Sequence, residues 1–261
     1  MKPDRNSSLQ TWIDWLLSLH AEEIDLGLAR IREVAGKLDL LTPQPLVISV
    51  AGTNGKGSSV AMLSAIYQAS GYQVGVYTSP HLLRFNERIQ INGKMADDQA
   101  IVEAFDTIES VRGQTKLTYF EFSTLAALMI FKRQPLDVMI LEVGLGGRLD
   151  AVNILDADAS LITAIDIDHS DWLGDDRSVI ALEKAGITRP HKIAICSDND
   201  IPDSLMQYAL EHQINLKCLG TDFSYLPTTP AWQFLAQDTT FSNLTTLPYP
   251  SLKGDFQLQN A

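Results

Sequence analysis

A glycine-rich segment with one lysine is the part of this sequence best suited to hold phosphate. Glycines let a backbone curl around phosphate oxygens with its N–H groups pointing inward. A helix that starts directly after such a turn aims its N–H groups and its dipole at the anion. A lysine in the turn can reach the β- and γ-phosphates of a nucleotide. We therefore predict that ATP binds here and that Lys56 acts in phosphoryl transfer. The segment consists of Gly52, Thr53, Asn54, Gly55, Lys56, Gly57 and Ser58.

The spacing of this segment differs from the strict P-loop pattern, G-x-x-x-x-G-K-[ST]. Val50 occupies the first glycine position, and Gly57 follows the lysine. A kinase or GTPase of the standard type is therefore a weaker interpretation. The alternative to a phosphate site is a purely structural glycine-rich turn with an exposed lysine and no ligand.

Three polar side chains follow other apolar runs, where strands would end. Glu142 follows 138–141, and a carboxylate there is costly unless it is paired or bound to a metal. Because Mg²⁺ prefers hard oxygen ligands, Glu142 is the best metal-ligand candidate, with a solvated loop carboxylate as the alternative. The Ser79 hydroxyl could ligate a metal or merely cap a turn. His169 could bind a cation or be structural.

The elements that must position these groups are apolar strands alternating with helices. We predict strands at 46–50, 74–78, 138–141, 160–165 and 193–196. We predict helices at 11–19, 26–37, 58–71, 100–111, 122–132 and 178–184. This alternation favours an α/β fold with a mostly parallel sheet and helices on both faces. Ligands of such sheets bind beyond the carboxyl ends of the strands, where the candidate residues fall.

The composition of the sequence limits the kinds of molecule with which the protein is expected to interact. The formal net charge of −12 argues against nucleic acid as a partner. No apolar run approaches the roughly 20 residues that a membrane span needs, and the first ten residues lack an apolar signal core. The two cysteines, Cys196 and Cys218, have no metal-type spacing and fit a reducing compartment. We expect a cytoplasmic protein with small-molecule substrates, as a monomer.

The 261 residues are expected to form one ATP-binding domain, 1–261. Between about 221 and 252 the composition shifts to Thr, Pro, Ser and aromatic residues, which predicts a small β ribbon. Residues 253–261 read as a loop that enters a helix. We expect this to be the start of an interdomain segment, with a C-terminal domain of the parent protein absent.

The segment Gly-Thr-Asn-Gly-Lys-Gly-Ser resembles the phosphate loop of the Mur ligase superfamily, in the form typical of its folate branch. Four further segments are similar to the same family: Thr78-Ser79-Pro80-His81, Glu142-Val143-Gly144, Asp168-His169-Ser170 and Glu183-Lys184-Ala185-Gly186. The resemblance implies ATP-dependent ligation of L-glutamate to dihydropteroate and to reduced folates through an acyl phosphate. The alternatives are another amino-acid ligase of the superfamily, or an ATP-binding module that does not turn over.

The resemblance also implies roles for individual residues. Ser79, Glu142 and His169 would bind Mg²⁺, with two metal sites, and His169 would be catalytic. Lys184 would be carbamylated by CO₂ and would be catalytic. Without the resemblance, a lysine in the middle of a helix would be interpreted as a solvated surface residue. Asn260 would contact the adenine or ribose of ATP.

An acceptor pocket follows from the same resemblance. Phe120 could stack on a flat ring of the acceptor. Alternatively, Phe120 could be an aromatic residue of the core that precedes a helix. Asp25 could contact the acceptor or could instead cap the following helix. The residues that the resemblance places in this pocket are Asp25, Leu26, Thr118, Phe120, Glu121, Leu149, Asp150 and Ala151.

Overall fold

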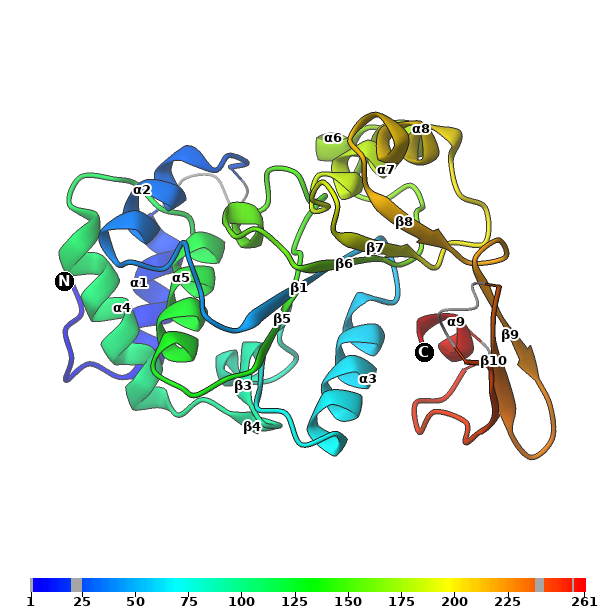
Figure 1. Ribbon diagram of the computed structural model, residues 1–261. Helices are drawn as coiled ribbons and strands as arrows, with labels where there is room; N and C mark the ends of the chain where they lie inside the picture. The colour runs from blue at the N-terminus through cyan, green and yellow to red at the C-terminus, as the bar shows by residue number, and fades with distance from the viewer. Residues whose placement is uncertain (1, 20–24, 238–241, 255) are drawn as a thin grey trace.

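The structure is a computed structural model that describes residues 2–19, 25–237, 242–254 and 256–261. An eight-stranded sheet runs through its centre, and a separate three-stranded sheet lies beside the C-terminus (Figure 1). The large sheet has the strand order β4-β3-β2-β5-β1-β6-β7-β8. Its strands are β1 (Leu46–Ala51), β2 (Val74–Tyr77), β3 (Ile89–Ile91), β4 (Lys94–Met95), β5 (Val138–Glu142), β6 (Ala159–Ile162), β7 (Ile193–Cys196) and β8 (Asn215–Cys218).

Six of these strands, from β2 to β8 across the sheet, pair in parallel. The strands β3 and β4 form an antiparallel edge on β2. In the central register, Val50 of β1 lies beside Glu142 of β5. The prediction of a mostly parallel α/β sheet is confirmed.

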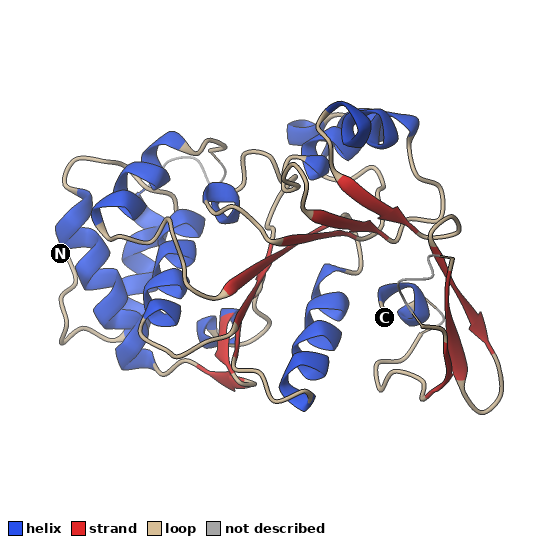
Figure 2. Cartoon of the chain, in the orientation of Figure 1, coloured by secondary structure: helices blue, strands red, loops and turns tan. Residues whose placement is uncertain are grey.

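Helices cover both faces of the sheet (Figure 2). On one face, α3 packs against β1, β2 and β5. On the other face lie α1, α2, α4 and α5, and further along it α7 and α8 (Figure 1). The helices are α1 (Leu9–Leu19), α2 (Ala29–Lys37), α3 (Lys56–Ala69), α4 (Asp98–Arg112), α5 (Tyr119–Lys132), α6 (Ser170–Leu173), α7 (Arg177–Ala185), α8 (Asp203–Glu211) and α9 (Gln257–Asn260), with 3₁₀ turns η1 (Phe85–Arg88) and η2 (Ala151–Ile154).

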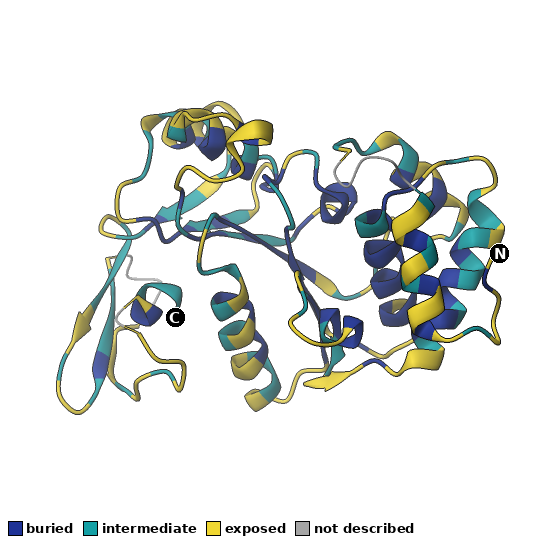
Figure 3. Ribbon diagram, turned by 180° about the vertical axis from the view of Figure 1, so that it is seen from behind, coloured by how far each residue is buried: buried dark blue, intermediate teal, exposed yellow. Residues whose placement is uncertain are grey.

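Two apolar cores result from this layering. The larger one lies between the sheet and the α5 side and contains the fully buried rings of Trp12, Phe105 and Phe122. The smaller one lies between the sheet and α3 and is built mainly from valine and isoleucine. Because both faces are covered, the central strands β1 and β5 are buried apart from Leu46 at the start of β1 (Figure 3), which explains their continuous apolar sequences.

Several boundaries of helices and strands in the structure differ from the predicted ones. The phosphate-loop helix begins at Lys56 rather than at 58, and the helix predicted at 26–37 begins only at Ala29. The strand predicted at 160–165 ends at Ile162. Four elements, β3, β4, α8 and β8, have no counterpart among the predicted ones, because they are short, partly exposed and lack a long apolar run.

The predicted ribbon is confirmed as a three-stranded antiparallel sheet. Its strands are β9 (Phe223–Pro227), β10 (Trp232–Ala236) and β11 (Leu244–Leu247). The ribbon lies near α9, at the end of the molecule away from the N-terminus (Figure 1). Among the described helices, none is long and apolar enough to cross a membrane.

Candidate active site

The phosphate loop joins the end of β1 to the start of α3. Gly55 caps the helix with a left-handed φ of +89°, and Gly52 has a φ of +154°. A side chain is strained in either conformation, so the loop depends on glycine at both positions. The first N–H groups of the 14-residue helix α3 therefore face the space beyond the strand ends, as a phosphate site requires.

Neighbouring segments hold this loop in place. The Thr163 hydroxyl donates to the carbonyl of Asn54 at 2.6 Å, and the N–H of Thr53 donates to the carbonyl of Ala164 at 2.7 Å. The Thr53 hydroxyl also bonds the backbone of Asp166 at 2.9 Å. Thr163 was missed by the sequence reasoning, because it fell inside the strand predicted at 160–165, whereas the strand ends at Ile162.

Lys56 folds back over its own loop. Its Nζ donates to the carbonyls of Gly52 at 2.7 Å and Thr53 at 3.2 Å. Burial lowers the pKa of this ammonium, while the charges of Glu142 and Asp168 oppose that shift. The lysine thus stands at the loop, among carboxylates, as the phosphate prediction requires.

Glu142 and Ser79 come together at the carboxyl ends of β5 and β2. The N–H of Ser79 donates to Oε2 of Glu142 at 3.1 Å. Glu142 is 4% exposed, and burial raises the pKa of its carboxyl group. Its other oxygen, Oε1, lies beside the first turn of α3, where a β-carbon on Gly57 would be 3.9 Å away. The predicted metal ligand therefore sits next to the predicted phosphate site.

These residues fit a hard cation. Neither Oε1 of Glu142 nor the hydroxyl of Ser79 has a hydrogen bond to a described residue, so both oxygens are available. Within the described residues no three His, Cys, Asp or Glu side chains cluster as a metal site. The remaining positions would therefore fall to water and to phosphate oxygens, as Mg²⁺ prefers.

His169 is more exposed than the other predicted ligands. It has a left-handed φ of +50°, and its side chain is 53% exposed. Its Nε2 lies 3.7 Å from Oδ2 of Asp168, and it borders the same cavity as Ser79. The structure thus places His169 at the site but does not join it to Glu142 by a contact.

Lys184 is buried, which overturns its ordinary interpretation as a solvated helix lysine. It is 3% exposed, on the inner face of α7. Burial, reinforced by the charge of Lys56, lowers its pKa to about 8. No hydrogen bond or ion pair links its amine to any residue that the structure describes.

A cavity of about 350 Å³ opens beside Ser79 and His169. All eight predicted acceptor residues line it, although they come from three separate segments. Arg88 also lines it and was missed, because an arginine in a short turn before an undetected edge strand carried no signal. The predicted residues in its wall are Asp25, Leu26, Thr118, Phe120, Glu121, Leu149, Asp150 and Ala151.

Phe120 and Asp150 shape one end of this cavity. The Phe120 ring packs so closely on Gly144 that a β-carbon there would lie 2.7 Å from the ring. Asp150 is 3% exposed and accepts backbone N–H bonds from Gly144, Leu145 and Val152, each at 3.0 Å. Burial nevertheless raises the pKa of Asp150 to about 6. The carboxylate therefore fixes the loop that supports the aromatic ring.

Thr118 and Glu121 form a capping box at the start of α5. Oε2 of Glu121 accepts from the N–H of Thr118 at 2.8 Å and from Nε of Arg30 at 2.9 Å. Oε1 is buried with no hydrogen-bond partner, and burial raises the pKa of the group. Arg30 also pairs with Asp25 at 2.6 Å. Asp25 does not cap α2, whose N-cap is Leu28, so the capping alternative is wrong.

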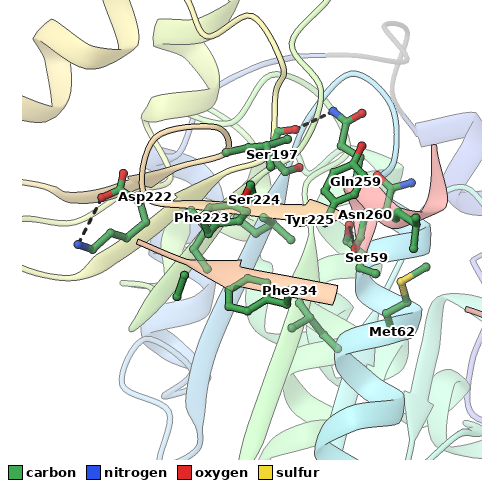
Figure 4. Close-up of a pocket in the computed structure, with 18 of the residues that line it drawn as sticks. Ser59, Met62, Ser197, Asp222, Phe223, Ser224, Tyr225, Phe234, Gln259 and Asn260 are labelled. Atoms are coloured by element: carbon green, nitrogen blue, oxygen red, sulfur yellow. Dashed lines mark hydrogen bonds and ion pairs between the residues drawn. The ribbon is translucent and has the colours of Figure 1, made fainter. Parts of the chain in front are cut away.

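Asn260 lies against the phosphate loop. Its side-chain oxygen stands where a β-carbon on Gly55 would collide with it, and its carbonyl accepts from the Ser59 hydroxyl at 2.9 Å. The helix α9 is held by Gln259, whose Nε2 donates to the carbonyl of Ser197 at 2.6 Å (Figure 4). Asn260 therefore reaches the nucleotide side of the site.

A second cavity, of about 270 Å³, lies between α3, the ribbon and α9 (Figure 4). Its walls are mainly apolar and include Met62, Phe223 and Phe234. None of the predicted acceptor residues lines it. The predicted acceptor residues thus line the cavity beside Ser79, although the second cavity is lined by more apolar residues.

Fold and site together define an α/β nucleotide-binding domain in which a phosphate loop adjoins the cavity beside Ser79. The chain belongs to the Mur ligase family, because residues 50–261 match the family model described as Mur ligase middle domain. The predicted family membership is confirmed.

Relatives in this family carry folate names. The chain is 48% identical over 242 residues to a dihydrofolate synthase/folylpolyglutamate synthase of Escherichia coli, covering 93% of this chain and 57% of the relative. It is 37% identical over 164 residues to a folylpolyglutamate synthase of Lacticaseibacillus casei, covering 60% of this chain and 38% of the relative.

Solved structures agree with these relatives. E. coli FolC in complex with DHPP and ADP has a TM-score of 0.94 at 45% identity, over 99% of this chain and 62% of that chain. A bifunctional folylpolyglutamate synthase/dihydrofolate synthase with Mn, AMPPNP and L-glutamate has a TM-score of 0.91 at 45% identity, over 100% of this chain and 61% of that one. The chain thus spans about three fifths of the length of the E. coli relative and of these two solved structures.

Proposed function

We propose that this protein takes part in the ATP-dependent ligation of L-glutamate to dihydropteroate and to reduced folates. The observation that carries the proposal is the cavity beside Ser79, in which eight acceptor residues from separate segments meet next to the phosphate loop. Relatives crystallised with ADP, AMPPNP, DHPP or L-glutamate support the same assignment.

In the first step, a carboxylate oxygen of the acceptor attacks the γ-phosphorus of ATP. The bond from that phosphorus to the bridging oxygen breaks, and ADP leaves. Lys56 is placed to balance the charge that spreads over the transferred group. In the second step, the α-amino nitrogen of glutamate attacks the acyl carbon, phosphate leaves, and the nitrogen loses a proton. Because holding the reactants supplies most of the catalysis, no protein nucleophile is required.

Mg²⁺ would be held by Ser79 and Glu142, with His169 serving a second site. When bound, it would neutralise phosphate charge. The buried Glu142 carboxylate has no cation paired with it among the described residues, so a dication would offset the cost of its burial. Asn260 would face the adenine or ribose, since it borders the phosphate loop.

Carbamylation of Lys184 is part of the proposal. CO₂ reacts with a neutral amine, and a pKa of about 8 leaves a useful neutral fraction near pH 7–8. In ¹³C-bicarbonate, the protein should show a carbamate carbon resonance that is absent from Lys184→Arg. A wild-type spectrum without that resonance would remove carbamylation from the proposal.

The first experiment is a calorimetric titration of the protein with dihydropteroate, in the presence of Mg²⁺ and a non-hydrolysable ATP analogue. We expect saturable binding that is lost in Phe120→Ala and retained in Tyr72→Ala, which removes an exposed aromatic ring that does not line the cavity. If the analogue binds but dihydropteroate does not, the folate assignment is wrong and another acceptor must be sought.

Turnover and nucleotide chemistry are tested separately. In an assay of ADP release, Lys56→Ala should lower the rate of phosphoryl transfer by orders of magnitude without unfolding the protein. A near-normal rate would overturn the phosphate-loop assignment. The cytoplasmic location and the monomeric state remain predictions, to be tested by fractionation and by sedimentation.

A further inference from the structure

Arg88 is a buried arginine that faces the acceptor cavity. It closes the turn η1, and its carbonyl accepts from the N–H of Thr78 at 2.9 Å, which ties it to the end of β2. The residue is only 7% exposed, yet it lines the cavity together with Ser79 and His169. Its position is therefore set by backbone contacts near the predicted metal ligands.

Three side chains hold the guanidinium in one orientation. Nε donates to Nδ1 of His81 at 2.8 Å, so His81 acts as the acceptor through that nitrogen. The guanidinium carbon lies 5.5 Å from the ring centre of Tyr119 and 5.7 Å from that of Phe85. Such cation–π contacts restrain the plane of the group but leave its two terminal nitrogens without a partner.

The charge of Arg88 has no ion-pair partner among the described residues, although it lies near enough to Glu142 to lower the pKa of that carboxyl group. No carboxylate lies within ion-pair distance of it, and its terminal nitrogens donate no hydrogen bond to a described residue. Other partly buried arginines do not share this state: Arg30 pairs with Glu121, Arg177 with Asp198, and Arg189 with Asp156. A buried cation without a partner is costly, so its retention indicates an anion that arrives with a ligand.

We propose that Arg88 binds the carboxylate of the acceptor, the group that is to be phosphorylated. This inference rests on the proposed function of the cavity. The planar fork of a guanidinium matches a carboxylate through two parallel hydrogen bonds. Phe120 and Asp150 lie in the same cavity, so a ligand stacked on the ring would place its distal carboxylate along the cavity. His81 is then a positioning residue that orients Arg88.

A carboxylate is favoured over the nucleotide phosphates as the partner. The phosphates have their own site, formed by Lys56 and the N-terminus of α3. Arg88 belongs instead to the wall that holds Phe120 and Asp150, and it is not part of the phosphate loop. A fixed fork there would hold the carboxylate beside Ser79 and Glu142, where the γ-phosphate would be presented.

The test compares two ligands on three proteins. Dihydropteroate and its uncharged primary amide are titrated calorimetrically into wild type, Arg88→Met and Arg88→Lys, with Mg²⁺ and an ATP analogue present. Wild type should prefer the carboxylate by about 10- to 100-fold, the value of a charged hydrogen-bonded pair. In Arg88→Met this preference should disappear, so that the two ligands bind with about equal affinity. In Arg88→Lys it should be intermediate, because the charge remains while the fork is lost.

The outcomes separate this proposal from the function on which it rests. If wild type binds both ligands equally, the acceptor pocket stands and the role of Arg88 is wrong. If Arg88→Met weakens both ligands by the same factor, the residue only supports the pocket wall, and the proposal fails. If the variant weakens the ATP analogue instead, Arg88 serves the phosphates and the proposal is again wrong.

If wild type binds neither ligand, the assignment of the acceptor pocket is wrong, and the role proposed for Arg88 is wrong with it. Arg133→Met is the matched control, since Arg133 is half exposed and lies outside the cavity. It should keep the wild-type preference. Should Arg88→Met fail to fold, Arg88→Lys and Arg88→Gln provide the same comparison, and a retained preference in Arg88→Gln would contradict the proposal.

Discussion

The Thr163 hydroxyl occupies the place that a β-carbon on Gly52 would need. That hydroxyl donates to the carbonyl of Asn54, so the residue that directly follows β6 holds the phosphate loop. The loop therefore depends on a glycine at position 52 for two reasons: its φ of +154° and the contact with Thr163. The phosphate site therefore depends on residues that follow two strands, β1 and β6, which are distant in sequence.

Gly52→Ala should disrupt the loop. We expect a loss of nucleotide affinity of at least tenfold and a destabilisation of about 1–3 kcal/mol, from backbone strain and the steric clash. Gly36→Ala on α2, away from the phosphate loop, is the control, because a β-carbon there meets nothing closer than 3.8 Å. Urea unfolding and titration with an ATP analogue measure both effects. Equal behaviour of the two variants would contradict the role of Thr163.

Arg30→Met should destabilise the protein by roughly 2–3 kcal/mol. The change leaves the buried Glu121 carboxylate without its cation, and such a loss costs far more than the loss of an exposed pair. Lys37→Met, which breaks the exposed pair with Glu33, should cost less than about 1 kcal/mol. Urea unfolding at pH 7 compares them. A further Glu121→Gln change should restore part of the loss, and its failure to do so would place the effect elsewhere.

Asp150 predicts a pH dependence of stability. Its folded-state pKa of about 6 lies above the ordinary value of 3.8, so the folded protein holds the proton more tightly than the unfolded chain does. This stabilising contribution is complete below about pH 4 and is lost as the pH rises through 6, up to about 3 kcal/mol in all. Unfolding free energies of Asp150→Asn should fall less than those of wild type between pH 4 and 7. Parallel curves would mean that Asp150 titrates normally.

Lys184 predicts the opposite slope at alkaline pH. Its folded-state pKa of about 8 lies below the ordinary 10.5, so the folded protein binds its proton more weakly than the unfolded chain does. Wild type should therefore gain stability as the pH rises from about 8 to 10.5. In CO₂-free buffer at pH 7, Lys184→Met should be more stable than wild type by up to about 3 kcal/mol.

Two controls accompany the Lys184 experiment. Lys94→Met removes an exposed lysine on β4 and should leave both the stability and its pH dependence unchanged. Added bicarbonate should raise the thermal midpoint of wild type but not that of Lys184→Met. A destabilised Lys184→Met at pH 7 would show that the amine makes a stabilising contact, contrary to the structure.

Much of the fold could be predicted because its signals are local. Continuous apolar runs marked the central strands, and the strand at 193–196 was predicted with its final boundaries. The phosphate loop is contiguous, so its glycines and Lys56 were visible together. Short, half-exposed elements such as β3 and β8 have no comparable pattern, because their stability comes from pairing with a neighbour that is already in place.

The residue types of the site were determined by the sequence alone, and so was the resemblance that gathered them into one hypothesis. Tertiary structure decided which of them meet and how each is charged. It buried Lys184 against its local pattern, set Asp25 beside Arg30 rather than at a helix cap, and left Arg88 without an ion-pair partner among the described residues. Burial and pairing of polar groups depend on segments far apart in the chain, so their energies cannot be obtained from local sequence.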